Sequence, residues 1–326
     1  MFGLGDTSSR ELMMFGCFTV AVGFMLYIDL FLVNRKAHII TIKSALIWSA
    51  IWIGTALIFN IFVYYELGRE KALMYFTAYI IEKSLSVDNL FVFIVVFGYF
   101  GIHPMYQPRV LRWGILGAIV LRAILIVIGI ELVQAFKWML YVFGAILIYT
   151  AYRLINGIAD EVEPGKNAAL KFVSRHLPVL TELHAEKFLV RINGVLHATP
   201  LLATLIVIES TDLIFALDSI PAVLGISQDL FIVYTSNIFA ILGLRALYFA
   251  LAGVMQLFHY LKYALAIILG FIGIKMLIHD FVKIPIEYAL LVVFGLLAFA
   301  IAASVIFPQK DRDIEKAEVA ITPDEE

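Results

Sequence analysis

The sequence predicts an all-α polytopic membrane protein with about nine transmembrane helices, and three observations support this prediction. The chain of 326 residues is 62% hydrophobic and 15% charged, whereas a soluble domain is closer to half apolar and a quarter charged. Its mean hydropathy is +0.95. The surplus apolar residues fall into runs of about twenty, the length that crosses a hydrocarbon core of about 30 Å.

The apolar runs place the spanning helices along most of the chain. We expect them at 11–33, 44–65, 73–100, 112–133, 138–155, 198–221, 230–255, 262–279 and 286–307. One membrane domain should therefore cover residues 1–307, followed by a polar cytoplasmic tail at 308–326. The ranges 73–100 and 198–221 differ from the others because acidic residues interrupt their apolar sequence.

Charge and cysteine content exclude several classes of function. A net charge of −2 gives no reason to expect nucleic acid as a partner. The single cysteine, Cys17, can form neither an internal disulfide nor a redox dithiol. No motif for haem, flavin or another cofactor is visible, and no cleavable signal peptide precedes the first apolar run.

Lys and Arg residues in the loops predict the orientation of the chain. With nine spans the termini lie on opposite sides, and the C-terminal side collects 15 Lys and Arg residues against 5 on the N-terminal side. Since cytoplasmic loops carry the excess of positive charge, we expect a cytoplasmic C-terminus and an external N-terminus.

The longest polar loop, about 156–197, is cytoplasmic in this interpretation and offers a surface for a protein partner. Its segment Lys166–Leu177 alternates apolar and basic residues at helical spacing, which fits a helix on the membrane surface or a plain connecting helix. Asn193-Gly194 between two short apolar segments predicts a β-hairpin with a type I′ turn.

Two regions of the chain resemble each other. Glu82-x5-Asp88 aligns with Asp212-x5-Asp218, and the next helix in each region carries a buried arginine, Arg122 or Arg245. A glycine-rich segment follows in both. We therefore expect two inverted three-helix repeats, at about 73–155 and 198–279, with a site near the midplane where they meet.

Carboxylates inside these helices indicate a cation site. An ionised carboxylate at the bilayer centre costs roughly 2.5–3.5 kcal/mol or more, so the charge should be paired, protonated or bound to a cation. The expected metal ligands are Glu82, Asp88, Glu209, Asp212 and Asp218. The expected supporting polar residues are Ser84, Asn89, Ser219, Arg122 and Arg245, with the two arginines as counter-charges or, for Arg122, as a residue reaching toward the headgroups.

Helical geometry limits how these carboxylates can meet. At about 100° per residue, Glu209 and Asp212 lie about 60° apart on one face, and Asp218 lies about 120° from Asp212. A straight helix cannot direct all three to one ion. Because Pro221 removes a backbone donor, we expect both acidic helices to be broken or distorted near the carboxylates, with the two acidic clusters facing each other.

The donor set favours a hard divalent ion. The carboxylates are accompanied by Ser, Thr and Asn side chains, while the histidines lie near helix ends or in loops. Mn²⁺, Mg²⁺ or Ca²⁺ therefore fits better than Zn²⁺ or Cu⁺.

Two long segments carry a resemblance to a known family. The stretches that begin Glu82-Lys-Ser-Leu-Ser-Val-Asp-Asn-Leu-Phe and Glu209-Ser-Thr-Asp-Leu-Ile-Phe-Ala-Leu-Asp resemble the two signature segments of the TerC family of integral membrane proteins, and nearby stretches resemble its Alx-like branch. The resemblance covers most of the chain. It implies a protein of the bacterial inner membrane linked to Mn²⁺ homeostasis, most simply export, with the five acidic residues as the metal site.

Three other functions stay open at this point. A membrane factor could bind metal or deliver it to partner proteins without transport. An intramembrane aspartyl protease is disfavoured because the Gly3-Leu-Gly-Asp6 string precedes the first helix. Direct redox chemistry is disfavoured by the single cysteine. We therefore expect a transporter and no enzyme.

Overall fold

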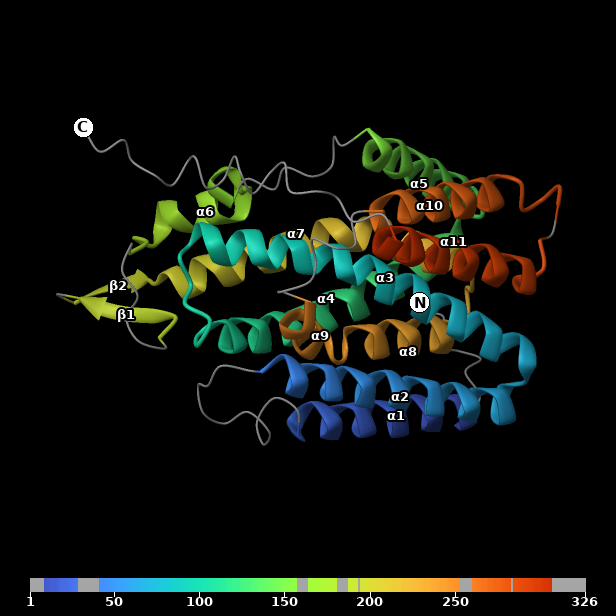
Figure 1. Cartoon of the computed structure of the whole chain (residues 1–326), viewed down its shortest axis with the longest axis horizontal. Helices are drawn as coiled ribbons and strands as arrows, with labels where there is room; N and C mark the ends of the chain where they lie inside the picture. Colours follow the sequence, from blue (N-terminus) through green and yellow to red (C-terminus); the bar gives the residue numbers. More distant parts are fainter. Residues whose placement is uncertain are drawn as a thin grey trace.

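The structure, a computed structural model, is an assembly of α-helices with one small β-hairpin (Figure 1). It describes residues 9–28, 41–156, 164–180, 187–192, 194–251, 260–282 and 284–306. The elements in chain order are α1 (Ser9–Tyr27), α2 (Ile42–Leu67), α3 (Arg69–Tyr99), α4 (Gln107–Ala135), α5 (Met139–Ile155), η3 (Pro164–Lys166), α6 (Ala168–His176), β1 (Leu189–Ile192), β2 (Val195–Ala198), α7 (Pro200–Leu224), α8 (Leu230–Ile241), α9 (Leu244–Leu251), α10 (Leu261–Leu277) and α11 (Ile286–Ile306).

Every range expected to span the membrane contains a helix, and the seventh is divided into α8 and α9. Within the described residues, α2, α4, α7 and α11 are long and apolar enough to cross a bilayer, and the bent pair α8–α9 makes a fifth. Helix α3 is long, but Glu82, Lys83 and Asp88 interrupt its apolar sequence. The all-α membrane fold is therefore confirmed, while the number of nine spans stays a prediction.

The outer surface of the helices is apolar and the interior contains charge. Val20, Ile58, Leu291 and Phe299 are each more than 65% exposed. Arg122, by contrast, is among the largest fully buried side chains. This distribution suits a lipid environment, in which apolar side chains face outward and ionisable ones face the interior.

Helices α3 and α8 lie side by side and run in the same direction. Lys71 near the start of α3 forms an ion pair with Asp229, the N-cap of α8, at 2.6 Å. Twelve residues further along α3, Lys83 donates to the carbonyl oxygen of Ala240 near the end of α8. Both contacts advance together along the two helices, so the pair is parallel.

Helices α4 and α7 form a second parallel pair. Gly117 on α4 lies against Glu209 on α7, Arg122 binds Asp212, and Gly129 lies against Ile220. In contrast, α5 and α10 cross in opposite directions. Gly144 lies against Leu277 and Gly273, and Ala151 lies against Gly270. The close contact of Gly144 with the Gly273 backbone brings these two helices very near each other.

The prediction that the two acidic helices are broken or distorted near their carboxylates was wrong. Helices α3 and α7 each run as one α-helix through their carboxylates. The hydroxyls of Ser84 and Thr211 hydrogen-bond to carbonyls one turn earlier in their own helices, which leaves the helical path intact. Pro221 lies in the last turn of α7, so its missing N–H group removes a backbone hydrogen bond only near the end of the helix.

The polar loop forms the structures that its sequence indicated. Strands β1 and β2 pair antiparallel with Ile192 opposite Val195, and Gly194 has φ +83°, which confirms the hairpin. The Lys166–Leu177 segment contains helix α6. The hairpin and α6 lie together at one end of the helical assembly (Figure 1). The tail at 308–326 lies outside the described residues.

Candidate metal centre

Arg122 of α4 joins the two helices that carry the acidic motifs. Its guanidinium forms an ion pair with Glu82 of α3. It also binds Asp212 of α7 through two contacts, Nη2 to Oδ1 at 3.1 Å and Nε to Oδ2 at 3.4 Å. The planar guanidinium is suited to this two-pronged binding of a carboxylate. One buried side chain therefore holds carboxylates from α3 and α7 together.

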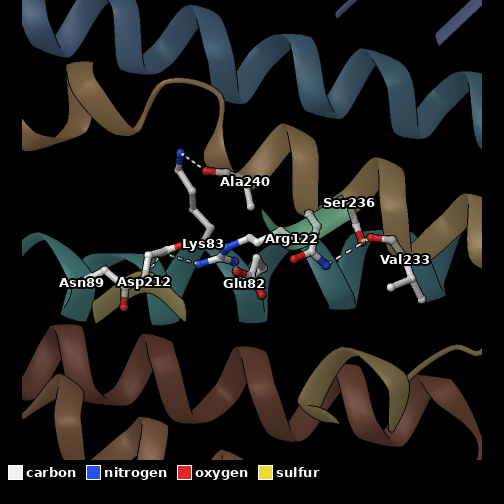
Figure 2. A network of polar contacts seen from close by, with 9 residues as sticks. Glu82, Lys83, Asn89, Arg122, Asp212, Val233, Ser236 and Ala240 are labelled. Carbon is white, nitrogen blue, oxygen red and sulfur yellow. Dashed lines mark hydrogen bonds and ion pairs between the residues drawn. The ribbon is translucent and has the colours of Figure 1, made fainter. Parts of the chain in front are cut away.

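The centre is almost completely enclosed. Glu82 is 0% exposed, Arg122 1% and Asp212 5%. Asn89 of α3 donates from Nδ2 to Asp212 Oδ1 at 3.3 Å. Figure 2 shows Glu82, Arg122 and Asp212 directed toward one another, with Asn89 beside Asp212. The expected meeting of the two acidic motifs is thus realised for Glu82 and Asp212, which we call the central carboxylates.

Lys83 completes the charge balance of this region. It follows Glu82 in the chain, but its side chain extends away from the carboxylates and donates to the carbonyl oxygens of Ala240 and Leu242 at 3.1 and 3.3 Å (Figure 2). The two central carboxylates, when ionised, are thus matched by Arg122 and Lys83. A cation that binds the carboxylates has to compete with the guanidinium of Arg122.

Glu209 lies one turn before Asp212 on α7 and faces the same neighbour, α4. Its carboxylate rests against Gly117, where a Cβ atom would overlap it. The glycine therefore provides the space for this side chain. The sequence placed Glu209 and Asp212 on one face of a straight helix, and both do face α4.

Asp218, which was expected among the metal ligands of a distorted helix, instead contacts α5. Its Oδ1 accepts a hydrogen bond from Thr150 of α5 at 2.7 Å. The side chain of Asp88 lies outside the described part of the structure. Among the residues that are described, no group of three or more His, Cys, Asp or Glu side chains lies close enough to hold a metal ion. Metal binding by all five carboxylates therefore stays a prediction.

The supporting residues take different positions. The Ser84 hydroxyl donates to the Ile80 carbonyl of its own helix at 2.7 Å. Ser219 is buried, and its hydroxyl has no hydrogen-bond partner among the described residues. Arg245 is buried on α9. Asn89 and Arg122 both contact Asp212, one of the central carboxylates.

Sequence reasoning gave no role to Lys83 or Thr150. Lys83 contacts the α8–α9 break, and the local signal for that break in the sequence was Gly243. Thr150 belongs to a helix without charged residues until Arg153. Both contacts join residues far apart in the chain, which spacing within one helix cannot indicate.

Comparison with known proteins places this arrangement in a family. Residues 67–312 match the model of the integral membrane protein TerC family. The Alx protein of Salmonella typhi, described provisionally as a membrane-bound redox modulator, is 47% identical over 93% of this chain and 97% of its own length. Its counterpart in Escherichia coli K12 is 49% identical over 87% of this chain and 92% of its own.

An uncharacterized membrane protein of Myxococcus xanthus is 47% identical over 90% of this chain and 93% of its own length. No solved structure matches the chain. The family match covers both acidic motifs and the arginine between them. The chain therefore belongs to the TerC family of multi-pass integral membrane proteins.

Proposed function

We propose that this protein transports divalent metal cations and that its cargo is Mn²⁺ exported from the cytoplasm. The observation that supports this most directly is the convergence of Glu82 and Asp212 from two helices on the buried Arg122. Ionisable groups at membrane depth are costly and mark ion pathways. A purely structural role would be served at lower cost by apolar packing.

Arg122 and the cargo ion compete for the same carboxylates in this proposal. Without cargo, the guanidinium binds both Glu82 and Asp212. A divalent cation that reaches them takes over this charge, and the guanidinium moves away. Loading and unloading of the site would thereby change the contact between α3, α4 and α7.

Glu209 would receive the ion first. Helix α7 begins directly after the polar loop, which carries the positive charge expected on the cytoplasmic side. Glu209 is nearer than Asp212 to that end of α7 and faces the same helix. It therefore lies between the cytoplasm and the central carboxylates.

The helix directions support the two inverted repeats. The repeats match α3 with α7, α4 with α8–α9, and α5 with α10. This match turns the pair α3–α8 into the pair α7–α4, and both pairs are parallel. It also matches α5 with α10, and these two helices run in opposite directions. An inverted repeat requires both relations. Such repeats have their site at the interface between them. A site formed by Glu82 of the first repeat and Asp212 of the second would lie at this interface.

The remaining details of the transporter follow from composition. We propose nine spans in the bacterial inner membrane, with α1, α3, α5 and α10 added to the five spans that length and apolarity support. The C-terminus would be cytoplasmic and the N-terminus external. Oxygen donors favour Mn²⁺ over softer ions, with Ca²⁺ and Mg²⁺ as competitors.

The redox description of the relatives fits this proposal indirectly. Cys17 is exposed on α1, and it is the only cysteine in the chain. One thiol cannot cycle through an internal disulfide. A redox effect would then arise through the supply of manganese to other proteins, and replacement of Cys17 by Ser should leave transport intact.

Flux of Mn²⁺ into proteoliposomes tests the proposal. We expect uptake by the wild-type protein and loss of at least about 90% of it in Asp212→Asn and in Glu82→Gln, because each removes a ligand charge from the proposed site. Asp280→Asn serves as the control, since this carboxylate is exposed in a loop after α10 and should leave flux unchanged. Ca²⁺ and Mg²⁺ are added as competitors.

Absence of flux in the wild-type protein would reject a transporter. If the same preparation still binds Mn²⁺ through Glu82 and Asp212, the protein is instead a membrane factor that binds metal or delivers it to partners, with the loop at 156–197 as the docking surface. Flux that persists in both variants would place the site elsewhere.

A further inference from the structure

The seventh membrane helix is interrupted at a position that only glycine suits. Helix α8 ends at Ile241, α9 begins at Leu244, and the two are bent by 41°. Gly243 has φ +80°, a conformation that other residues rarely adopt. A Cβ atom at Gly243 would also lie 2.8 Å from the side chain of Trp52 on α2. The break is therefore fixed by both backbone and packing.

A helix that stops inside the protein leaves carbonyl groups without helical donors. The partial negative charge of the helix dipole is added at the same end. At the end of α8, the carbonyl oxygens of Ala240 and Leu242 both accept from the Lys83 ammonium, at 3.1 and 3.3 Å. In Figure 2, the Lys83 side chain leaves α3 and ends beside Ala240.

Backbone carbonyls at the end of an interrupted membrane helix are typical ligands for monovalent cations. The lysine ammonium is a compact charge with three donors, so it matches such a ligand set. We propose that the α8–α9 break forms a monovalent-cation site and that the Lys83 ammonium is its built-in occupant, which fixes α3 to the interrupted helix. This proposal does not depend on the identity of the transported ion.

A second lysine provides a matched comparison on the same pair of helices. Lys71 binds Asp229 at the other end of α8, but the two side chains are 39% and 27% exposed. Such an exposed ion pair contributes little because water and salt screen it. Removal of Lys71 opens no enclosed group of carbonyl oxygens, whereas removal of Lys83 does.

Chemical rescue of the full-length Lys83→Ala protein in detergent tests the proposal. Propylammonium contains the three methylene-chain carbons and the ammonium that this substitution deletes. The base buffer contains tetramethylammonium, which has a charge but no N–H donor. We expect an apparent unfolding temperature roughly 5 °C or more below wild type. Propylammonium should restore at least half of this loss with a saturable dose dependence.

Wild type and Lys71→Ala should not respond to propylammonium. Lys83→Met keeps an apolar stem of similar length but has no ammonium, so its unfolding temperature should fall as far as that of Lys83→Ala. Propylammonium should not rescue it, since the stem fills the space. Lys83→Arg keeps the charge but replaces the compact ammonium with a larger planar group, so its unfolding temperature should lie between those of wild type and Lys83→Ala. A Lys83→Met protein as stable as wild type overturns the proposal, and so does a Lys83→Ala protein equally unstable in both salts.

Discussion

At the scale of single residues, the candidate centre depends on a guanidinium shared by two carboxylates. Arg122 contacts Glu82 and Asp212, and all three side chains are buried. Burial makes each charge dependent on its partners, because removal of one partner leaves another charge without compensation. The same dependence makes the centre responsive to an added cation.

Replacement of Arg122 by Met should expose this dependence. The two carboxylates would stay buried without their counter-charge, at a cost of about 3–5 kcal/mol. Bound Mn²⁺ would supply the missing charge, and a ligand at a hundred times its Kd adds about 2.7 kcal/mol of stability. We expect a lower unfolding temperature than wild type and a larger rise on addition of Mn²⁺, measured in detergent with Mg²⁺ and EDTA as references.

Asp280→Asn is the control, and its Mn²⁺ response should equal that of wild type. An equal rise in Arg122→Met and wild type would show that the ion does not compete with this guanidinium.

The sequence predicted part of this centre and missed another part for a physical reason. The acidic motifs and Arg122 stood out because charge in an apolar run is costly wherever the chain folds. The angle between Asp212 and Asp218 was used to predict a distorted helix, whereas α7 runs unbroken and Asp218 contacts Thr150. Lys83 could not be interpreted in this way, since its partners are backbone carbonyls near residue 241 that become available only through a distant helix break.

At the scale of helices, the break occurs in a different place from the expected one. Pro221 suggested an interruption in α7, but it lies in the final turn. Gly243 causes the interruption of the next membrane segment, with its positive φ and its contact with Trp52. A glycine in an apolar helix is common in membranes, so its conformation could not be inferred from sequence.

The crossing of α5 and α10 should be sensitive to one methyl group. A Cβ atom at Gly144 would lie 2.9 Å from the backbone oxygen of Gly273, so Gly144→Ala has to push the two helices apart. Overpacking of this kind costs about 1–3 kcal/mol. We expect a lower apparent unfolding temperature in detergent for this variant.

Gly295→Ala on α11 is the matched control. Nothing lies within 4 Å of a Cβ atom at Gly295, so this variant should be unchanged or slightly more stable. Equal effects of the two substitutions would argue against close packing of α5 on α10.

At the scale of the whole molecule, the proposed inverted repeats at about 73–155 and 198–279 would have opposite orientations. The parallel pairs α3–α8 and α4–α7 and the antiparallel crossing of α5 and α10 agree with this proposal. The central carboxylates would come one from each proposed repeat, Glu82 from α3 and Asp212 from α7. A movement of one half against the other would therefore act directly on the contacts of Arg122.

Opposite orientations also predict which loops face which side of the membrane. Three proposed spans, α7, α8–α9 and α10, separate α6 from the loop that contains Asp280. In a Cys17→Ser background without other thiols, we expect Asp280→Cys to react with a membrane-impermeant maleimide on intact cells. Ser174→Cys on α6 should react only after the cells are permeabilised, and a C-terminal fluorescent fusion should be bright. Labelling of both sites on intact cells would mean that α7, α8–α9 and α10 do not all cross the membrane, and exchange of the two patterns would reverse the orientation.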